Sequence, residues 1–239
     1  MKNSIAIHNL NKAIPKVLDN ANRLVDDARQ LLDFNLPPTA YALCILAQEE
    51  YAKAFLIHLI SAGDLPWTQE VRSLLHDHTS KQLVTSIMDF LQPEDVFKWL
   101  IQQTENGHQL PPRITDAISI IRHEKSRKAP RSSWIAKSGL PCDSLARKIA
   151  DGHIDKNKQN AIYVGIGKNG EAVSTPDKTT KAKAKEELEK TDRLRRLFSS
   201  DGKIGVMDST VEAKRISLIF RLLFDLCPIA EFSTLWAMA

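Results

Sequence analysis

The chain has 239 residues, of which 43% are hydrophobic and 26% charged, and its net charge is +4. The length suits one large domain or two small ones, and the composition excludes a disordered or fibrous protein. The three cysteines are far apart and form no CxxC pair, which argues against a disulfide framework or a zinc site and predicts a cytoplasmic protein with reduced thiols. No signal-peptide core is visible, and charges interrupt the apolar stretch after Ile216, so no membrane partner is expected.

Two helices are predicted at the start of the chain. Apolar residues recur at heptad-like spacing from Val17 to Leu32, with charged residues on the other face, and Pro15 suits the first turn of this helix. Pro37 and Pro38 begin a second helix, which ends at Gly63. A short connection between two long apolar faces predicts an antiparallel hairpin of helices.

A third helical region begins near Trp67, and its apolar phase shifts at residues 76–80. Three residues there, Asp77, Thr79 and Ser80, are good N-caps, so we expect a break with Lys81 opening the next helix. Further helices are predicted at about 93–106, 114–121, 181–198 and 209–226.

Between these helices, residues 122–144 are basic at first and then loop-like, and residues 147–153 form a looser segment. Residues 161–166 have strand composition, and Lys168-Asn169-Gly170 is typical of a hairpin turn. Residues 171–174 are the predicted second strand of this hairpin. We therefore predict one all-α domain over residues 1–239. Its helical core covers about 10–121 and 178–227, and a basic loop and a small β-hairpin are inserted at about 122–177.

The second helix carries charged residues in an otherwise apolar sequence. Glu49 and Glu50 precede Lys53 by four and three residues, so either carboxylate can reach the ammonium along the helix. Such pairs are more often solvated salt bridges. Large apolar residues surround this helix on all sides, however, so we expect the pair to be partly buried or to meet another subunit.

Three segments resemble one protein family. Ala47-Gln48-Glu49-Glu50-Tyr51-Ala52-Lys53 and Asp77-His78-Thr79-Ser80-Lys81 resemble the Ala-x-Glu-Glu-x-x-Lys and Asp-His-x-x-Lys signatures of AbiV-type abortive infection proteins, which belong to the HEPN superfamily. Residues 158–164, followed by Pro176, resemble the Leu-Tyr-Val-Asp segment of these proteins and its downstream proline. Gly165 replaces the usual acidic residue, so any role of that acid is absent here. The resemblance implies a HEPN-like helical bundle and an antiphage effector that stops translation.

HEPN ribonucleases commonly carry an arginine followed a few residues later by a histidine. In metal-free RNA cleavage the histidine moves protons and the arginine holds the phosphate. Arg72 with His78, and Arg147 with His153, both match this loose pattern. We prefer the first pair because His78 lies in the His-x-x-Lys element at the predicted break, although the histidines there could simply cap the helix.

The expected catalytic set is Arg72, His78, Lys81, Glu49, Glu50 and Lys53, with no cofactor and no metal. The expected RNA contacts are Arg122, Lys125, Arg127, Lys128, Arg131 and Lys158. The basic helix at 181–198 is better explained as a solvated face.

The expected partners are RNA (tRNA, mRNA or rRNA), a second copy of the chain and a phage-encoded activator protein. A two-fold homodimer is predicted because the second helix and the C-terminal segment display more apolar surface than one bundle needs to bury. Two other functions stay open. One is a non-catalytic protein that arrests translation or senses infection by binding a phage or ribosomal component; the other is a scaffold whose polar cluster only fixes helix register.

Overall fold

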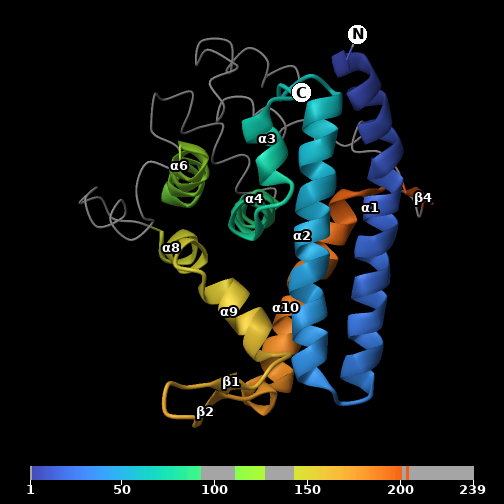
Figure 1. Cartoon of the computed structure of the whole chain (residues 1–239). Helices are drawn as coiled ribbons and strands as arrows, with labels where there is room; N and C mark the ends of the chain where they lie inside the picture. Colours follow the sequence, from blue (N-terminus) through green and yellow to red (C-terminus); the bar gives the residue numbers. More distant parts are fainter. Residues whose placement is uncertain (1, 93–110, 127–142, 201–202, 205–239) are drawn as a thin grey trace.

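Two long antiparallel helices, α1 (Lys2–Asp33) and α2 (Pro37–Ser61), form one side of the molecule (Figure 1). The computed structural model describes residues 2–92, 111–126, 143–200 and 203–204, and the statements below concern these residues. The predicted helices at 93–106 and 209–226 lie outside them. The all-α fold class with a small β-hairpin is confirmed.

The prediction that Pro15 opens the first helix is wrong. Helix α1 begins at Lys2, and Pro15 lies inside it. A proline there removes one backbone hydrogen bond from the helix. The helix continues nevertheless, because Ile14 and Leu18 on either side of the proline are buried in the core.

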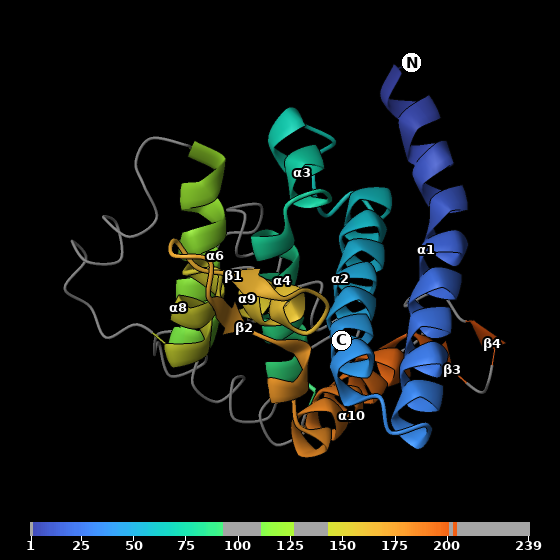
Figure 2. The same cartoon turned by 60° about the horizontal axis from the view of Figure 1, so that its bottom comes forward.

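Helix α2 is the central element, and 16 of its 25 residues are buried. It is covered by α1, by α4 (His78–Phe90), by α9 (His153–Asn160) and by α10 (Lys181–Leu197). Figure 2 shows α1, α2, α4 and α6 (Pro112–Ser126) side by side in this order, and α10 crosses α4, α2 and α1. Most of α2 is therefore buried within this chain, whereas the C-terminal segment, on which the homodimer prediction also rests, lies outside the described residues.

The predicted break before α4 is confirmed. Helix α3 (Gln69–Leu74) ends there, and α4 begins at His78 rather than at Lys81. Asp77 is the N-cap, and its carboxylate accepts a hydrogen bond of 2.7 Å from the backbone N–H of Ser80. The cap fixes where the first turn of α4 starts and hence where its side chains point.

The segment that was predicted to be loose contains two short helices, α8 (Ser144–Ala150) and α9. Asp143 caps α8 by accepting hydrogen bonds of 3.0 Å from the N–H groups of Leu145 and Ala146. The predicted strand at 161–166 is confirmed only at its end, where β1 (Gly165–Ile166) pairs antiparallel with β2 (Ala172–Ser174). A 3₁₀ turn, η1 (Pro176–Lys178), then leads into α10, whose N-cap is Thr180.

A second small hairpin, β3 (Ser199–Ser200) with β4 (Lys203–Ile204), follows α10 and was not predicted. Within the described ranges, no helix is both long enough and apolar enough to cross a membrane. Large apolar side chains are exposed around the first hairpin, namely Ile162, Tyr163, Val164, Ile166 and Val173.

Candidate functional site

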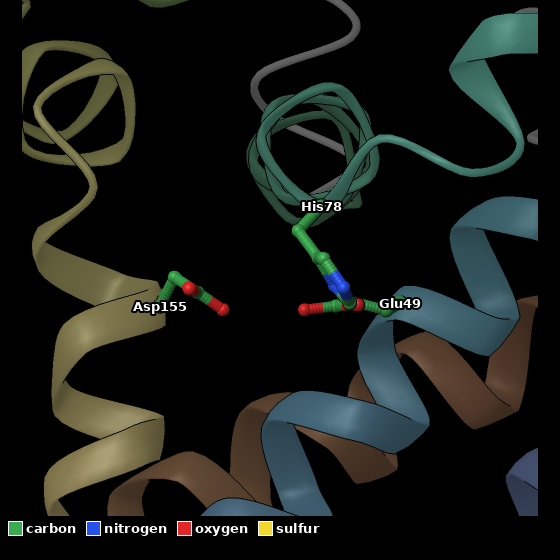
Figure 3. Close-up of side chains that lie close together, drawn as sticks. All are labelled: Glu49, His78 and Asp155. Carbon is green, nitrogen blue, oxygen red and sulfur yellow. The ribbon is translucent and has the colours of Figure 1, made fainter.

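Glu49 of α2 is a buried carboxylate that has four polar partners from other helices. Its side chain is 2% exposed. Oε2 lies 2.5 Å from Nδ1 of His78 and 3.3 Å from Nζ of Lys81, and Oε1 accepts hydrogen bonds of 3.0 Å from Gln82 and from Lys158. Three members of the expected catalytic set, Glu49, His78 and Lys81, thus lie together, and Figure 3 shows the carboxylate and the imidazole directed toward each other.

The first turn of α4 supplies three of these partners. His78, Lys81 and Gln82 stand at positions i, i+3 and i+4, which lie on one face of a helix. That face is turned toward α2 and Glu49. A single buried carboxylate therefore binds three side chains at the start of α4.

The carboxylate of Glu49 is held in its ionised form. Burial by itself raises its pKa, but the positive charges of Lys158 and Lys81 and the hydrogen bonds from Lys158 and Gln82 outweigh burial. The net effect lowers the pKa of Glu49 below its ordinary value of 4.5. At neutral pH this side chain accepts hydrogen bonds and donates none.

This protonation state determines the tautomer of His78. Because Glu49 has no proton to give, Nδ1 of His78 must carry the hydrogen in the 2.5 Å contact. Nζ of Lys158 lies 3.4 Å from the same Nδ1, and since both groups are donors we interpret this as a close approach rather than a hydrogen bond. In neutral His78 the free lone pair is then on Nε2, in a side chain that is 53% exposed.

Lys158 ties α9 to this cluster. Its Nζ lies 3.0 Å from Oε1 of Glu49 and 2.8 Å from Oδ1 of Asp155, one turn earlier in α9. Burial lowers the pKa of Lys158, but the hydrogen bond to Asp155 and the charge of Glu49 raise it by more, so the pKa is raised overall. Lys158 is thus a permanent cation at the centre of the cluster.

Three side chains of the cluster are potential metal ligands. One donor atom each from Glu49, His78 and Asp155 lies within 4.8 Å of the others, and the three come from α2, α4 and α9 (Figure 3). Asp155 was not among the predicted site residues.

Glu50 and Lys53 form a separate pair. The ammonium of Lys53 contacts the carboxylate of Glu50, and their side chains are 26% and 17% exposed. Glu49 is rotated by about 100° around the helix from Glu50, which points it to α4 instead. The prediction that Lys53 can serve either carboxylate thus holds for Glu50 alone.

The two predicted arginines lie elsewhere. The exposed guanidinium of Arg72 sits over the Trp67 ring, 5.6 Å from its centre, and within the described chain we find no contact between Arg72 and His78. Arg147 and His153 are both exposed, at the end of α8 and the start of α9, and neither contacts Glu49 among the residues described.

Most of the predicted RNA-binding residues are not described. Arg127, Lys128 and Arg131 lie outside the described residues, and for Arg122 and Lys125 only the helical backbone of α6 is described. Lys158 is described, and it contacts Glu49 and Asp155.

Gln82 and Asp155 were not predicted from the sequence. The available signals were weak: Gln82 is four residues after His78, and Asp155 is three before Lys158, which is ordinary helical spacing. Gln82 also lines a neighbouring pocket of about 410 Å³ between α4, α8, α9 and α10, whose other lining residues include Gln48 and Ile154.

The comparisons with known proteins give one family match. The family model HEPN_AbiV, described as AbiV, matches residues 9–196, a range that includes all of the cluster around Glu49. No curated protein and no solved structure matches the chain significantly.

Proposed function

The chain belongs to the AbiV family of HEPN-superfamily abortive infection proteins, and from this premise we propose that it is an antiphage effector that cleaves RNA. In this proposal His78 is the general base of a metal-independent endoribonuclease. The observation that carries the proposal is the contact between the ionised carboxylate of Glu49 and Nδ1 of His78.

The chemistry follows from this contact. A carboxylate that accepts the Nδ1 hydrogen fixes the orientation of the ring and leaves the lone pair of the neutral imidazole on Nε2. Nε2 of His78 can then take the proton of an RNA 2′-OH, whose oxygen attacks the adjacent phosphorus and expels the 5′-oxygen of the next nucleotide, which takes up a proton from water. The products are a 2′,3′-cyclic phosphate and a new 5′-OH end.

The surroundings of His78 support this assignment. The side chain is half-exposed, so a nucleotide can reach it, whereas Glu49 beneath it is excluded from water. Lys81 and Lys158 place two positive charges beside the single negative charge of Glu49, and Asp155 compensates Lys158. Fixed charges around a base of this kind need no reorganisation during the reaction.

The test is cleavage of total RNA and of a synthetic oligonucleotide by the purified protein, with EDTA present. His78→Ala should abolish cleavage and phage protection, and Glu49→Gln should reduce cleavage strongly. The matched control is His76→Ala, because His76 is an exposed histidine two residues away, outside α4. Fragments that persist with His78→Ala, or that lack cyclic phosphate ends, would contradict the proposed role.

A binding protein is the second candidate, and the exposed apolar residues around the first hairpin favour it. Tyr163 is 67% exposed and Val164 53%. Exposed apolar patches often mark contacts with a protein partner. Phage protection by the His78→Ala variant, without RNA fragments from the wild type, would favour this candidate.

We also propose that the protein is a homodimer and that the basic residues at 122–131 contact the RNA backbone. Both can be measured directly. Sedimentation should give twice the mass of the chain at micromolar concentration, and RNA binding should weaken steeply as salt is raised. A monomer would refute the first, and salt-independent binding the second.

A further inference from the structure

The ammonium of Lys158 stands among three potential metal ligands. Its Nζ is 3.0 Å from Oε1 of Glu49, 2.8 Å from Oδ1 of Asp155 and 3.4 Å from Nδ1 of His78. The three residues offer two carboxylate oxygens and one imidazole nitrogen, one donor atom from each lying within 4.8 Å of the other two. A positive charge is therefore already seated where these three side chains converge.

This ligand set has a chemical preference. Imidazole with carboxylates suits Zn²⁺ and its first-row neighbours, whereas Mg²⁺ and Ca²⁺ prefer oxygen alone. Ligand atoms on a tetrahedral Zn²⁺ are about 3.4 Å apart, given bonds of about 2.0–2.1 Å. Small side-chain movements close the present spacing to that value, provided that the ammonium leaves.

We propose that Glu49, His78 and Asp155 form a binding site for a divalent transition-metal ion such as Zn²⁺, and that Lys158 acts as a plug in it. The ion binds by displacing the ammonium of Lys158. The long, flexible stem of Lys158 lets the ammonium move out to water while it keeps its charge. With Lys158 displaced, Glu49 and Asp155 carry two negative charges against the single positive charge of Lys81.

Metal binding would also change the tautomer of His78. A metal ion on Nδ1 occupies the lone pair of that nitrogen, so the proton of the neutral ring moves to Nε2. Nε2 then has no lone pair with which to accept a proton from RNA. The ion is accordingly an inhibitor of cleavage, a consequence that rests on the proposed function, whereas the binding itself does not.

The ammonium of Lys158 lowers the apparent affinity of the site for a metal ion. If Lys158 is seated in about nine of ten molecules, the site is open in one of ten and the apparent dissociation constant is raised about tenfold. Lys158→Met removes the ammonium while it keeps most of the apolar stem. This variant should bind Co²⁺, a spectroscopic stand-in for Zn²⁺, at least about tenfold more tightly than the wild type.

The experiment is a titration of the full chain with Co²⁺, followed by its visible absorption, in the wild type, in Lys158→Met and in Lys158→Met/His78→Phe. The last variant keeps the charge of the site and removes only the nitrogen ligand. If His78 coordinates the ion, the double variant should lose the tighter Co²⁺ binding of Lys158→Met. If the carboxylates merely attract a cation, the double variant should keep that tighter binding. Mg²⁺ should not compete.

Two results would overturn the proposal. One is Co²⁺ binding to Lys158→Met that is no tighter than to the wild type, and the other is a gain that survives the loss of His78. If Lys158→Met does not fold, as judged by circular dichroism, Lys158→Gln is titrated in its place and the same two results decide. Zn²⁺ should in addition inhibit RNA cleavage by the wild type, and a protein that cleaves no RNA still yields the answer from Co²⁺ binding.

Discussion

Replacing Glu49 by glutamine is expected to lower the free energy of unfolding by about 3–5 kcal/mol, the usual effect of removing one partner from a buried ion pair. The substitution keeps the size of the side chain and the acceptor for Gln82, so the loss of charge is the main change. Lys158 retains Asp155 at 2.8 Å. Lys81 is left with its ammonium buried, at 7% exposure, and without the carboxylate at 3.3 Å.

The adjacent residue provides the matched control. Glu50→Gln makes the same chemical change one position along the same helix and breaks the pair with Lys53. Both side chains of that pair are more exposed than Glu49 and Lys81, at 17% and 26%. Its loss should therefore lower the free energy of unfolding by only about 0–1 kcal/mol.

Urea unfolding followed by circular dichroism measures both variants. A Glu49→Gln variant no less stable than Glu50→Gln would refute the reasoning from burial. A double variant tests whether the unpaired charge of Lys81 causes the loss of stability. Adding Lys81→Met to Glu49→Gln removes the unpaired charge and should recover most of the loss, so the two effects should be strongly non-additive.

The effect of Glu49 also depends on pH. Its pKa is lower in the folded protein than the ordinary value of 4.5. The unfolded chain therefore binds a proton at this residue more readily than the folded protein does, and the stabilisation is fully present above about pH 4.5. It is lost as the pH falls through the folded pKa. The difference between wild type and Glu49→Gln should be constant from neutral pH to about pH 5 and should shrink below it.

Three further predictions concern single residues. Asp77→Ala removes the cap bond to Ser80 and should lower the free energy of unfolding by about 1 kcal/mol in urea titrations; no loss would contradict the cap assignment. Burial raises the pKa of the Cys44 thiol to about 12, so iodoacetamide at pH 8 should leave the Cys44 peptide unmodified in native protein and modify it in urea, as mass spectrometry can check. Tyr51→Phe removes a hydroxyl that donates to Asn22 at 2.6 Å and should cost about 0.5–1.5 kcal/mol by the same unfolding assay.

The helices that were predicted correctly from the sequence are long or begin at residues typical of a helix start. Helix α2 is 25 residues long and begins at two prolines, and α10 begins at a capping threonine. Helices α8 and α9 were missed because seven and eight residues are too few to establish a helical period, and α9 has no buried residue. The start of α1 was missed because Pro15 is locally a good first-turn residue, and only burial of its neighbours carries the helix through it.

The residues of the candidate site also differ in how far the sequence could predict them. Glu49 and His78 are 29 residues apart, and a helix, a break and a second helix are enough to bring them together. Lys158 is 109 residues from Glu49, and its place depends on how the short helix α9 packs, which no local pattern reveals. Arg72 was assigned to the site from spacing alone, and spacing does not determine that it lies over Trp67.

The buried position of Glu49 bears on why the cluster exists. Replacing a whole buried ion network by apolar residues of similar volume is often neutral or stabilising, so stability alone does not account for one. If the cluster only fixed the register of α2 against α4, an apolar face would serve as well, and the half-exposed imidazole of His78 would need no carboxylate. A carboxylate that is kept ionised, dry and 2.5 Å from that imidazole is better explained by chemistry at its other nitrogen. Under the proposed function, the energetic cost of burying Glu49 serves RNA cleavage, so adding Lys81→Met to Glu49→Gln should recover stability without recovering cleavage.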